Sequence, residues 1–434
     1  MCPTTTAETI STIWRTESAR LVGALTRMTR DLDLAEDLAQ DALVAALEQW
    51  PDQGVPANPG AWLMSIAKRR GIDGFRRAET LHRKTQELAR TGEADAMPDL
   101  TDQVDFIEDD VLRLIFLSCH PALTPETRAA LTLRMVGGLT TGEIARGFVS
   151  TEKSMGQRIS RAKKTLREAG ADFELPTGAD RAARLDDVMA VIYLVFNEGY
   201  TATAGGDWMR PELTSEAIRL ARMLATLMPD EPDVHGLQSL LELQASRAPA
   251  RVDAQGNAVL LDDQDRSRWD ELLIRRGLAA LARAEALATR GKPVGSYFLQ
   301  AQIAAVHARA STADDTDWRA IATFYDLLAE AAPGAVVEVN RAVAHGRAFG
   351  AHAGLAVLDA VPDDALPGSH LPAAVRGDLL LRVGRAEEAA AAFRAAAELT
   401  RNERERAVLL ARAESAHQVA SDASYSGVSS PTDE

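Results

Sequence analysis

The sequence has few of the residues that form covalent or metal-centred sites. Cys2 and Cys119 are its only cysteines, too few and too far apart for a disulfide framework or a cysteine-based metal site. His120 follows Cys119 with no further ligand at metal spacing, so we expect this pair in the core and at a helix end. No glycine-rich phosphate loop is present, and the histidines have no partners at catalytic spacing. We therefore expect no cofactor, no metal and no enzymatic activity.

Long hydrophobic runs are missing as well. The longest one, residues 188–196, has nine residues, whereas a membrane-spanning helix needs about 20. No signal peptide opens the chain. These observations predict a cytoplasmic protein with no membrane partner, and its 434 residues allow two to four domains.

Positive charge is scarce, but only in one half of the chain. The net charge is −15; residues 1–170 hold 22 Lys and Arg against 24 Asp and Glu, and residues 171–434 hold 26 against 39. The acidity therefore belongs to the second half. We expect that half to meet protein or to repel nucleic acid, because a strongly acidic surface does not bind phosphates.

The most informative stretch is residues 139–167. Thr140 and Glu143 have the spacing of a capping box, which predicts the start of one short helix. Ser150 is placed to cap a second helix from about Thr151. The apolar residues of the second helix recur at helical spacing and predict one buried face: Met155, Ile159, Ala162 and Leu166.

The opposite face of that second helix is polar and basic. Two short helices joined by a tight turn, the second one basic, are typical of a helix-turn-helix that enters the major groove of DNA. The alternative is a solvated basic helix in a bundle. The candidate DNA-binding residues are Lys153, Gln157, Arg158, Ser160, Arg161 and Lys164, with Lys163 and Arg167 on the flanks. Gly156 is unusual, because glycine inside a helix costs about 1 kcal/mol relative to alanine.

Two earlier segments also carry concentrated charge. Residues 31–41 hold five acids and no base, and we expect the acids to face outward while the leucines pack inward. Residues 61–84 hold seven bases against two acids, interleaved with Trp62 and Phe75, a pattern that suits phosphates and unpaired bases. The alternatives are a solvated acidic face, and a buried Trp62 with its arginines in solvent. Residues 87–110 hold nine acids against Arg90 and predict a linker.

The second half has an almost entirely helical pattern. Gly350 and Gly384 lie 34 residues apart, and Gly377, Ala389 and Phe393 fit the small and aromatic positions of a tetratricopeptide helix pair. The alternative is an ordinary alanine-rich bundle. Residues 251–261 suggest a small hairpin. The acids that precede a helix near residue 271 fit capping roles rather than metal binding: Asp262, Asp263, Asp265 and Asp270.

The first 170 residues resemble the extracytoplasmic-function sigma factors, the two-domain promoter-recognition subunits of bacterial RNA polymerase. The order of segments matches: DLAEDLAQDALVAAL, PGAWLMSIAKRRGIDGFRR, an acidic linker, and a helix-turn-helix that ends in QRISRAKKTL. A tetratricopeptide-like extension after such a module resembles one group of these factors. In that group the extension is taken to control activity in place of a membrane anti-sigma factor.

The resemblance implies a role for each charged segment. The acidic helix would dock on the clamp of the largest polymerase subunit, the next helix would recognise and melt the minus-ten element, and the helix-turn-helix would bind the minus-thirty-five element and its polymerase docking site. The implied polymerase contacts are Asp31, Asp33, Glu36, Asp37, Gln40 and Asp41. The implied minus-ten contacts are Trp62, Lys68, Arg69, Arg70, Asp73, Arg76 and Arg77, although the family often has Asn in place of Asp73.

We therefore expect an all-α protein: a sigma factor that recruits polymerase core to promoter DNA. The expected parts are region 2 (residues 1–80), an acidic linker (81–108), region 4 (109–175), a helical tetratricopeptide-like extension with a regulatory role and a protein or peptide partner (176–420), and a disordered tail (421–434). The alternatives are a helix-turn-helix regulator that is not a polymerase subunit, and a helical-repeat interaction scaffold.

Overall fold

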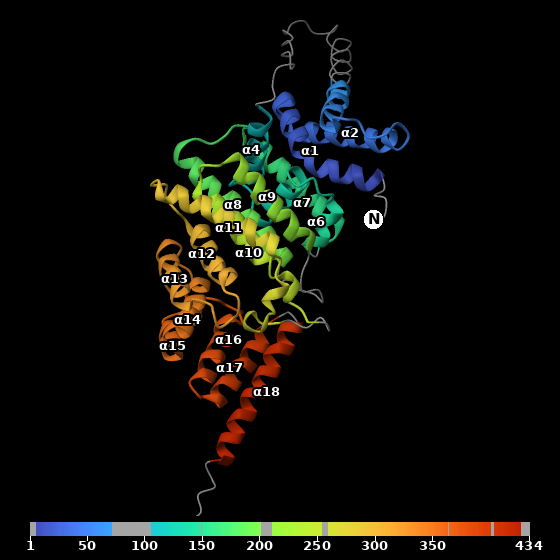
Figure 1. The fold of residues 1–434 in the computed structure, drawn as a ribbon. Coiled ribbons are helices and arrows are strands. Elements are labelled where there is room, and N and C mark those ends of the chain that lie inside the picture. Colours follow the sequence, from blue (N-terminus) through green and yellow to red (C-terminus); the bar gives the residue numbers. More distant parts are fainter. Residues whose placement is uncertain are drawn as a thin grey trace, which may run out of the picture. The chain divides into compact units, whose positions relative to one another are not determined.

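The computed structural model describes residues 6–71, 106–148, 150–200, 211–253, 259–362, 364–400 and 403–426. Apart from an isolated bridge at Val252, the regular structure of these residues is helical, which confirms the all-α prediction (Figure 1). The chain forms two compact units, Met1–Val195 and Phe196–Glu434. Each unit is described by itself below.

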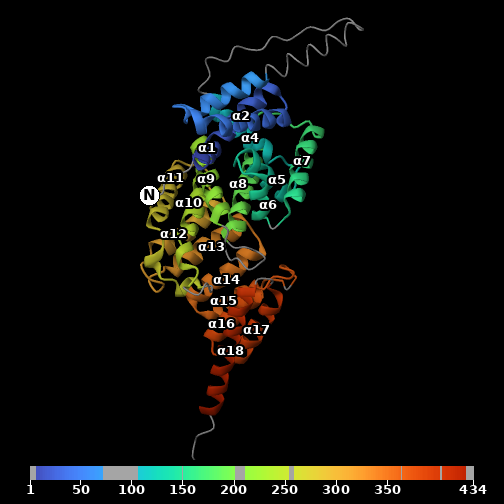
Figure 2. The same ribbon diagram turned by 90° about the vertical axis from the view of Figure 1, so that its right-hand side faces the viewer.

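The first unit holds both segments that flank the expected linker. Its helices are α1 (Thr6–Thr29), α2 (Leu32–Gln53), residues 59–71, α4 (Phe106–Ser118), α5 (Pro125–Met135), α6 (Thr141–Gly147), α7 (Glu152–Glu168) and the first part of α8 (Gly178–Tyr200). Helices α5, α6 and α7 lie next to one another (Figure 2). Residues 72–105, with most of the expected linker, lie outside the described residues.

Helix α1 packs closely on α4, the helix that follows the expected linker. A Cβ atom on Gly23 would lie 2.9 Å from the carbonyl oxygen of Asp110 in α4, so the two helices meet there at glycine distance. The Asp110 carboxylate is fully buried and pairs with Arg27 of α1 and Arg113 of α4, both at 2.9 Å. Burial raises the pKa of Asp110, although both guanidinium groups oppose that shift. A buried pair of this kind holds two segments in one arrangement, because separating them would strand a charge.

The second unit holds the remainder of α8 and ten further helices among the described residues. These are α9 (Pro211–Leu227), α10 (Pro232–Ala245), α11 (Glu271–Thr289), α12 (Ser296–Arg309), α13 (Trp318–Ala331), α14 (Ala335–Phe349), α15 (Ala351–Asp359), α16 (Leu371–Arg382), α17 (Ala386–Leu399) and α18 (Glu403–Ser426). Three short 3-10 turns lie between α10 and α11: η1 (Ala248–Ala250), η2 (Leu261–Asp263) and η3 (Arg266–Arg268). Asp270 caps α11 and Asp265 caps η3, as expected.

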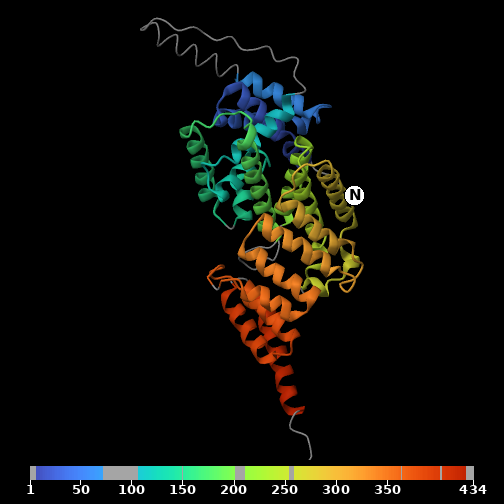
Figure 3. The same ribbon diagram turned by 90° about the vertical axis from the view of Figure 1, so that its left-hand side faces the viewer.

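The last helices form the expected pairs of tetratricopeptide type. Gly350 and Gly384 end the first helix of two successive pairs, and both adopt a positive φ, 99° and 79°. A Cβ atom on Gly377 would lie 2.7 Å from the ring of Phe393, which is fully buried. Small residues therefore let α16 and α17 approach closely, and the successive helices from α14 to α18 can be followed in Figure 3 by their orange and red colours.

Two expectations about boundaries need correction, and a third lies partly outside the described residues. Helix α18 continues to Ser426, so residues 421–426 of the expected disordered tail are helical; the Ser421 hydroxyl donates to the His417 carbonyl at 3.0 Å inside its last turns. Helix α4 begins at Phe106, inside the expected linker, because its apolar face packs on α1. In the expected hairpin the Val259 N–H donates to the Arg251 carbonyl at 2.8 Å, and residues 254–258 lie outside the described residues.

Candidate nucleic-acid interface

Helices α6 and α7 form the predicted helix-turn-helix. The Thr140 hydroxyl accepts from the N–H of Glu143 at 3.2 Å, and the Glu143 carboxylate accepts from the N–H of Thr140 at 2.8 Å, which confirms the capping box. Helix α7 is capped by Thr151, whose hydroxyl accepts from the N–H of Ser154 at 3.1 Å. The expected Ser150 cap was therefore wrong by one residue, because α7 begins at Glu152 and a cap stands directly before its helix.

Helix α7 buries the face that its spacing predicted and presents the opposite face to solvent. Met155, Ile159, Ala162 and Leu166 are all buried. The candidate DNA-binding residues on the other face are exposed, except Arg158, which is half-buried: Lys153, Gln157, Arg158, Ser160, Arg161 and Lys164. The Nη2 of Arg161 donates to the Gln157 side chain at 3.4 Å, so these two predicted base contacts lie side by side.

The first turn of α6 is tied to α1 by charge. Arg15 pairs with Glu143 at 2.7 Å. Burial alone would raise the pKa of Glu143, but hydrogen bonds from Thr140 and the charge of Arg15 lower it below its ordinary value. The orientation of the helix-turn-helix therefore depends on α1 as well as on its own packing.

The acidic start of α2 differs from the expectation at one residue. Asp31 is exposed and caps the helix, accepting from the N–H groups of Asp33 and Leu34 at 2.8 and 3.1 Å. Glu36, expected to face outward, is 9% exposed. Basic side chains of α5 and α7 cover Glu36, so its place on an acidic helix did not reveal its burial.

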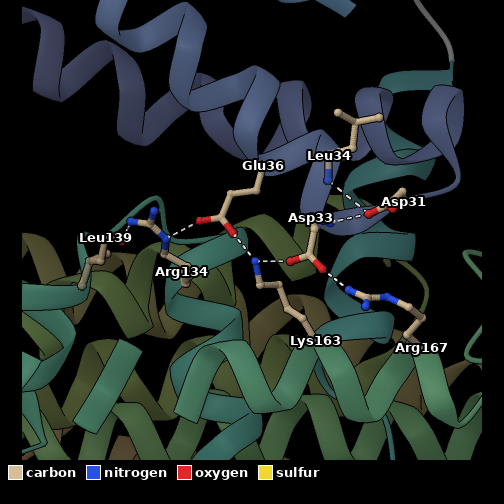
Figure 4. Close-up of polar contacts among 8 residues, drawn as sticks. All are labelled: Asp31, Asp33, Leu34, Glu36, Arg134, Leu139, Lys163 and Arg167. Carbon is tan, nitrogen blue, oxygen red and sulfur yellow. Dashed lines mark hydrogen bonds and ion pairs between the residues drawn. The ribbon is translucent and has the colours of Figure 1, made fainter. Parts of the chain in front are cut away.

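Asp33 and Glu36 lie at the centre of an ion-pair network (Figure 4). Glu36 accepts from the Nε of Arg134 at 2.7 Å and from the Nζ of Lys163 at 2.9 Å. Asp33 pairs with both Lys163 and Arg167. Burial alone would lower the pKa of Lys163, but Asp33 and Glu36 raise it above its ordinary value. We call these five residues the α2–α7 clasp.

The clasp uses only the flank of α7. Lys163 and Arg167 face α2, whereas the adjacent Lys164 is exposed and pairs only loosely with Glu168, at 3.6 Å and four residues on. Lys163 and Arg167 were predicted as flanking charges, but their partners on α2 were not. Arg134 was not predicted; the signal for it was a cation between the buried Leu133 and Met135 near the end of α5.

The remaining predicted acids lie further along α2. Asp37 and Asp41 are exposed and Gln40 is half-buried. Burial first, and then the nearby charges of Glu36, Asp33 and Asp41, raise the pKa of Asp37, although Lys163 opposes them. Asp41 pairs with Arg70 at 3.0 Å, so one predicted polymerase contact touches one predicted minus-ten contact.

The second basic patch is only partly described. Trp62 is half-buried and packs edge-on against the buried Trp50, with ring centroids 5.2 Å apart. Lys68 and Arg70 are half-buried and Arg69 is exposed. Of the other predicted contacts, Asp73, Arg76 and Arg77 lie outside the described residues.

Comparison with known proteins identifies the family. Models of Sigma-70 region 2 and Sigma-70 region 4 match residues 13–80 and 113–166. A probable ECF RNA polymerase sigma factor, SigI of Mycobacterium tuberculosis (strain CDC 1551 / Oshkosh), is 29% identical over 161 residues, 37% of this chain and 55% of SigI. The chain belongs to the extracytoplasmic-function sigma factors of the sigma-70 family. That membership implies RNA polymerase core and promoter DNA as its partners, and the family is not one of enzymes.

Other matches of this sigma factor say less about its function. A family of unknown function, DUF6596, matches residues 184–285. An uncharacterized protein of Rhizobium meliloti (strain 1021) is 43% identical over 390 residues, 89% of this chain and 91% of that protein. A tetratricopeptide repeat protein from Parabacteroides merdae ATCC 43184 is 13% identical with a TM-score of 0.33, covering 63% of this chain and 97% of that one. The helix pairs of α14 to α18 are therefore described from their own geometry.

Two further findings concern the described residues of the sigma factor. None of their helices combines the length and the apolar character that crossing a membrane requires. In the same residues, no group of three or more His, Cys, Asp or Glu side chains is placed to hold a metal ion. Cys119 is buried next to the Thr132 hydroxyl at 3.4 Å, and burial raises the pKa of its thiol to about 12.

Proposed function

We propose that this chain initiates transcription by bringing polymerase core to promoters through residues 1–80 and 109–175, joined by the linker 81–108. The exposed polar and basic face of α7 supports contact with the minus-thirty-five element. The acids of α2 support docking on the clamp of the largest polymerase subunit. The half-buried Trp62 and the bases after it support capture of unstacked bases at the minus-ten element. In this proposal the sigma factor itself catalyses no covalent chemistry during initiation.

The single observation that carries this proposal is the exposed face of α7. In a basic helix that only stabilised a bundle, the basic side chains would form ion pairs with acids of neighbouring helices. On α7 the flanking Lys163 and Arg167 pair with acids of α2, while Gln157, Ser160 and Arg161 are exposed to solvent. Because the paired cations and the exposed polar side chains lie on different parts of α7, the arrangement favours DNA recognition over the solvated-helix alternative.

The clasp gives the proposal a consequence for the free protein. Asp33 and Glu36 are implied polymerase contacts, yet both are already paired with cations of α5 and α7. Polymerase can use these two carboxylates only after the clasp opens, and opening at the same time releases Lys163 and Arg167 from their carboxylate partners. We propose that the described arrangement is the polymerase-free form, and that core binding exchanges one set of ion pairs for another.

The extension of residues 176–420 is proposed to regulate this step and to take a protein or peptide partner on its stacked helix pairs.

The contacts of α8 bear on the proposed boundary of region 4 at residue 175. Arg184 donates to the Phe116 carbonyl at 2.6 Å, and Asp187 pairs with Arg128 at 2.6 Å. Because these contacts join α8 to α4 and α5, a working region 4 needs residues beyond 175.

Run-off transcription tests the proposed function. The full-length chain and a chain ending at Tyr200 are each mixed with polymerase core and DNA that carries a suitable promoter. We expect promoter-dependent transcripts from at least one of them. Absence of a transcript from both, with DNA on which a known sigma factor of the same group is active, contradicts the proposal. A core pull-down separates it from the non-polymerase regulator, since only a sigma factor needs α2.

A further inference from the structure

The Phe196–Glu434 unit contains a small pocket with an unusual charge. Its volume is about 330 Å³, and it lies between the chain that follows α10 and helices α16 and α18. Three arginines and one histidine line it, against a single carboxylate: Arg247, Arg251, Arg412, His370 and Glu405. Aliphatic side chains line it as well, among them Val259, Leu260, Val408 and Leu409. A lining that combines cations with aliphatic side chains suits an anion with a hydrophobic body.

Most of these polar groups already have structural partners. Arg412 pairs with Asp378 and stacks on Phe393, 4.4 Å from the ring centroid. Arg251 lies 3.9 Å above the ring of Tyr200 and donates to its carbonyl. The Nε2 atom of His370 lies 3.5 Å from Glu405. Arg412, Arg251 and His370 therefore have structural roles in the pocket. The arginine that remains to bind a ligand is Arg247.

Arg247 has no carboxylate partner among the described residues. Its Nε is buried and makes no hydrogen bond. Its guanidinium instead lies 5.2 Å from the ring of Trp269, and the guanidinium of Arg266 lies 5.1 Å from the same ring. Burial lowers the pKa of Arg247, and the neighbouring charges of Arg266 and Arg251 lower it further. Arg247 and Arg266 are both half-buried and lie against one aromatic ring, so two cations lie close together here and no carboxylate of the described residues pairs with Arg247.

A partly buried charge without a counter-ion is costly, and a bound anion offsets that cost. The N–H groups of Arg266 already donate to the carbonyls of His307 and Ala310 and to Thr316, so Arg266 is not available to an anion in the way that Arg247 is. Guanidinium groups bind carboxylates and phosphates with paired hydrogen bonds. A volume of about 300 Å³ is at the lower end of small-ligand pockets.

We propose that this pocket binds a small organic anion, with its carboxylate or phosphate group on Arg247 and its apolar body on the wall of Val259 and Leu409. The second unit would then respond to a small molecule as well as to any protein partner. This inference does not depend on the proposed role in transcription, because it rests only on residues of the Phe196–Glu434 unit.

Thermal unfolding of the full-length chain tests the inference. The probes are benzoate and phenyl phosphate, which distinguish a carboxylate from a phosphate head group, with benzamide as the neutral match and chloride at equal ionic strength. We expect at least one anion to raise the melting temperature of the second unit by about 2–5 °C, while benzamide and chloride do not. If neither anion raises it above the chloride control, the inference is wrong.

Two variants separate a ligand site from a structural arginine. Arg247→Met keeps the length and the stacking on Trp269 but removes the charge. We expect it to leave the ligand-free melting temperature unchanged or higher, and to abolish the shift caused by the anion. Arg376→Met is the matched control, since Arg376 lies on the surface of α16 and pairs with Asp359 at 2.6 Å. It should retain the shift. A shift that persists in Arg247→Met overturns the assignment, and so does a shift lost equally in both variants.

Discussion

At the residue scale, the outward face of α7 is the part of the protein that we propose to recognise DNA sequence. Arg161 and Gln157 lie within hydrogen-bonding distance, an arrangement that holds both side chains ready for base edges. Each bidentate contact between an arginine and a guanine contributes about 1–3 kcal/mol of discrimination. Phosphate contacts give no such discrimination, because every sequence has the same backbone.

Arg161→Ala therefore tests whether the α7 face recognises bases. We expect binding to the minus-thirty-five element to weaken by about 1–3 kcal/mol, with a smaller loss on scrambled DNA. The measurement is fluorescence anisotropy of labelled duplexes with the reconstituted holoenzyme. Lys164→Ala is the control, since a phosphate contact should weaken both duplexes alike. Equal losses on both duplexes from Arg161→Ala would exclude a base contact.

Gly156 and Gly138 make a matched pair for stability. A Cβ atom on Gly156 would meet Thr141 at an ordinary 3.8 Å, so Gly156→Ala should stabilise the first unit by up to about 1 kcal/mol through helix propensity. Gly138 has φ 69°, and a Cβ there would lie 2.5 Å from the Ser18 hydroxyl, so Gly138→Ala should destabilise it. Denaturant unfolding measures both. Destabilisation by Gly156→Ala would mean that α7 needs the glycine for a reason other than space.

At the element scale, the clasp couples the polymerase-binding helix to the DNA-binding helix. Lys163→Gln removes the cation that touches both Asp33 and Glu36 while leaving both acids in place. We expect this variant to bind polymerase core about 3–10-fold more tightly, since each factor of ten corresponds to about 1.4 kcal/mol of lost closed-state stability. Surface plasmon resonance with immobilised core measures it.

Lys164→Gln is the control for the clasp, because it removes the neighbouring charge of the same helix without touching α2. Its affinity for core should equal that of the unmodified chain. Unchanged affinity in Lys163→Gln would show that opening the clasp is not part of core binding. The proposed sigma activity itself would stand in that case, since run-off transcription measures it separately.

The clasp also makes a prediction about pH. The pKa of Lys163 is raised in the folded protein above its ordinary value of 10.5. A raised lysine pKa stabilises the fold fully below pH 10.5, and that stability is lost as the pH rises through the folded-state pKa. The difference in unfolding free energy between the unmodified chain and Lys163→Gln should therefore be constant near neutral pH and shrink in alkali. A difference that already shrinks near pH 8 would point to another titrating group.

At the scale of the whole molecule, charge is divided between the two halves of the chain. Residues 1–170 are close to neutral and residues 171–434 carry an excess of 13 acids. Such an excess lowers the affinity of the whole chain for DNA at low ionic strength, and salt screens the effect because the Debye length falls to about 10 Å at 0.1 M.

A chain ending at Tyr200 therefore should bind promoter duplex more tightly than the full chain at low salt. We expect the difference to decrease steadily as salt is added, and anisotropy titrations over a salt series measure it. Equal affinities at low salt would mean that the acidic extension does not act through its charge. A difference independent of salt would instead indicate a direct steric effect.

Sequence periodicity and capping chemistry predicted much of this molecule. The capping box of Thr140 and Glu143, the buried face of α7 and the helix pair around Gly384 are local features, fixed by residues within a few turns of one another. The family resemblance has the same origin, since it rests on contiguous segments that match the sigma-70 regions.

Other features were decided only by tertiary structure. Glu36 was expected in solvent because its own helix gives no reason to bury it; Arg134 and Lys163, 98 and 127 residues away, supply that reason. The same holds for Arg247, whose missing partner is apparent only when the elements around it are packed. Sequence therefore determined the helices and the family of this protein. Tertiary packing decided which charges are paired, because an ion pair depends on distance in space and not on separation along the chain.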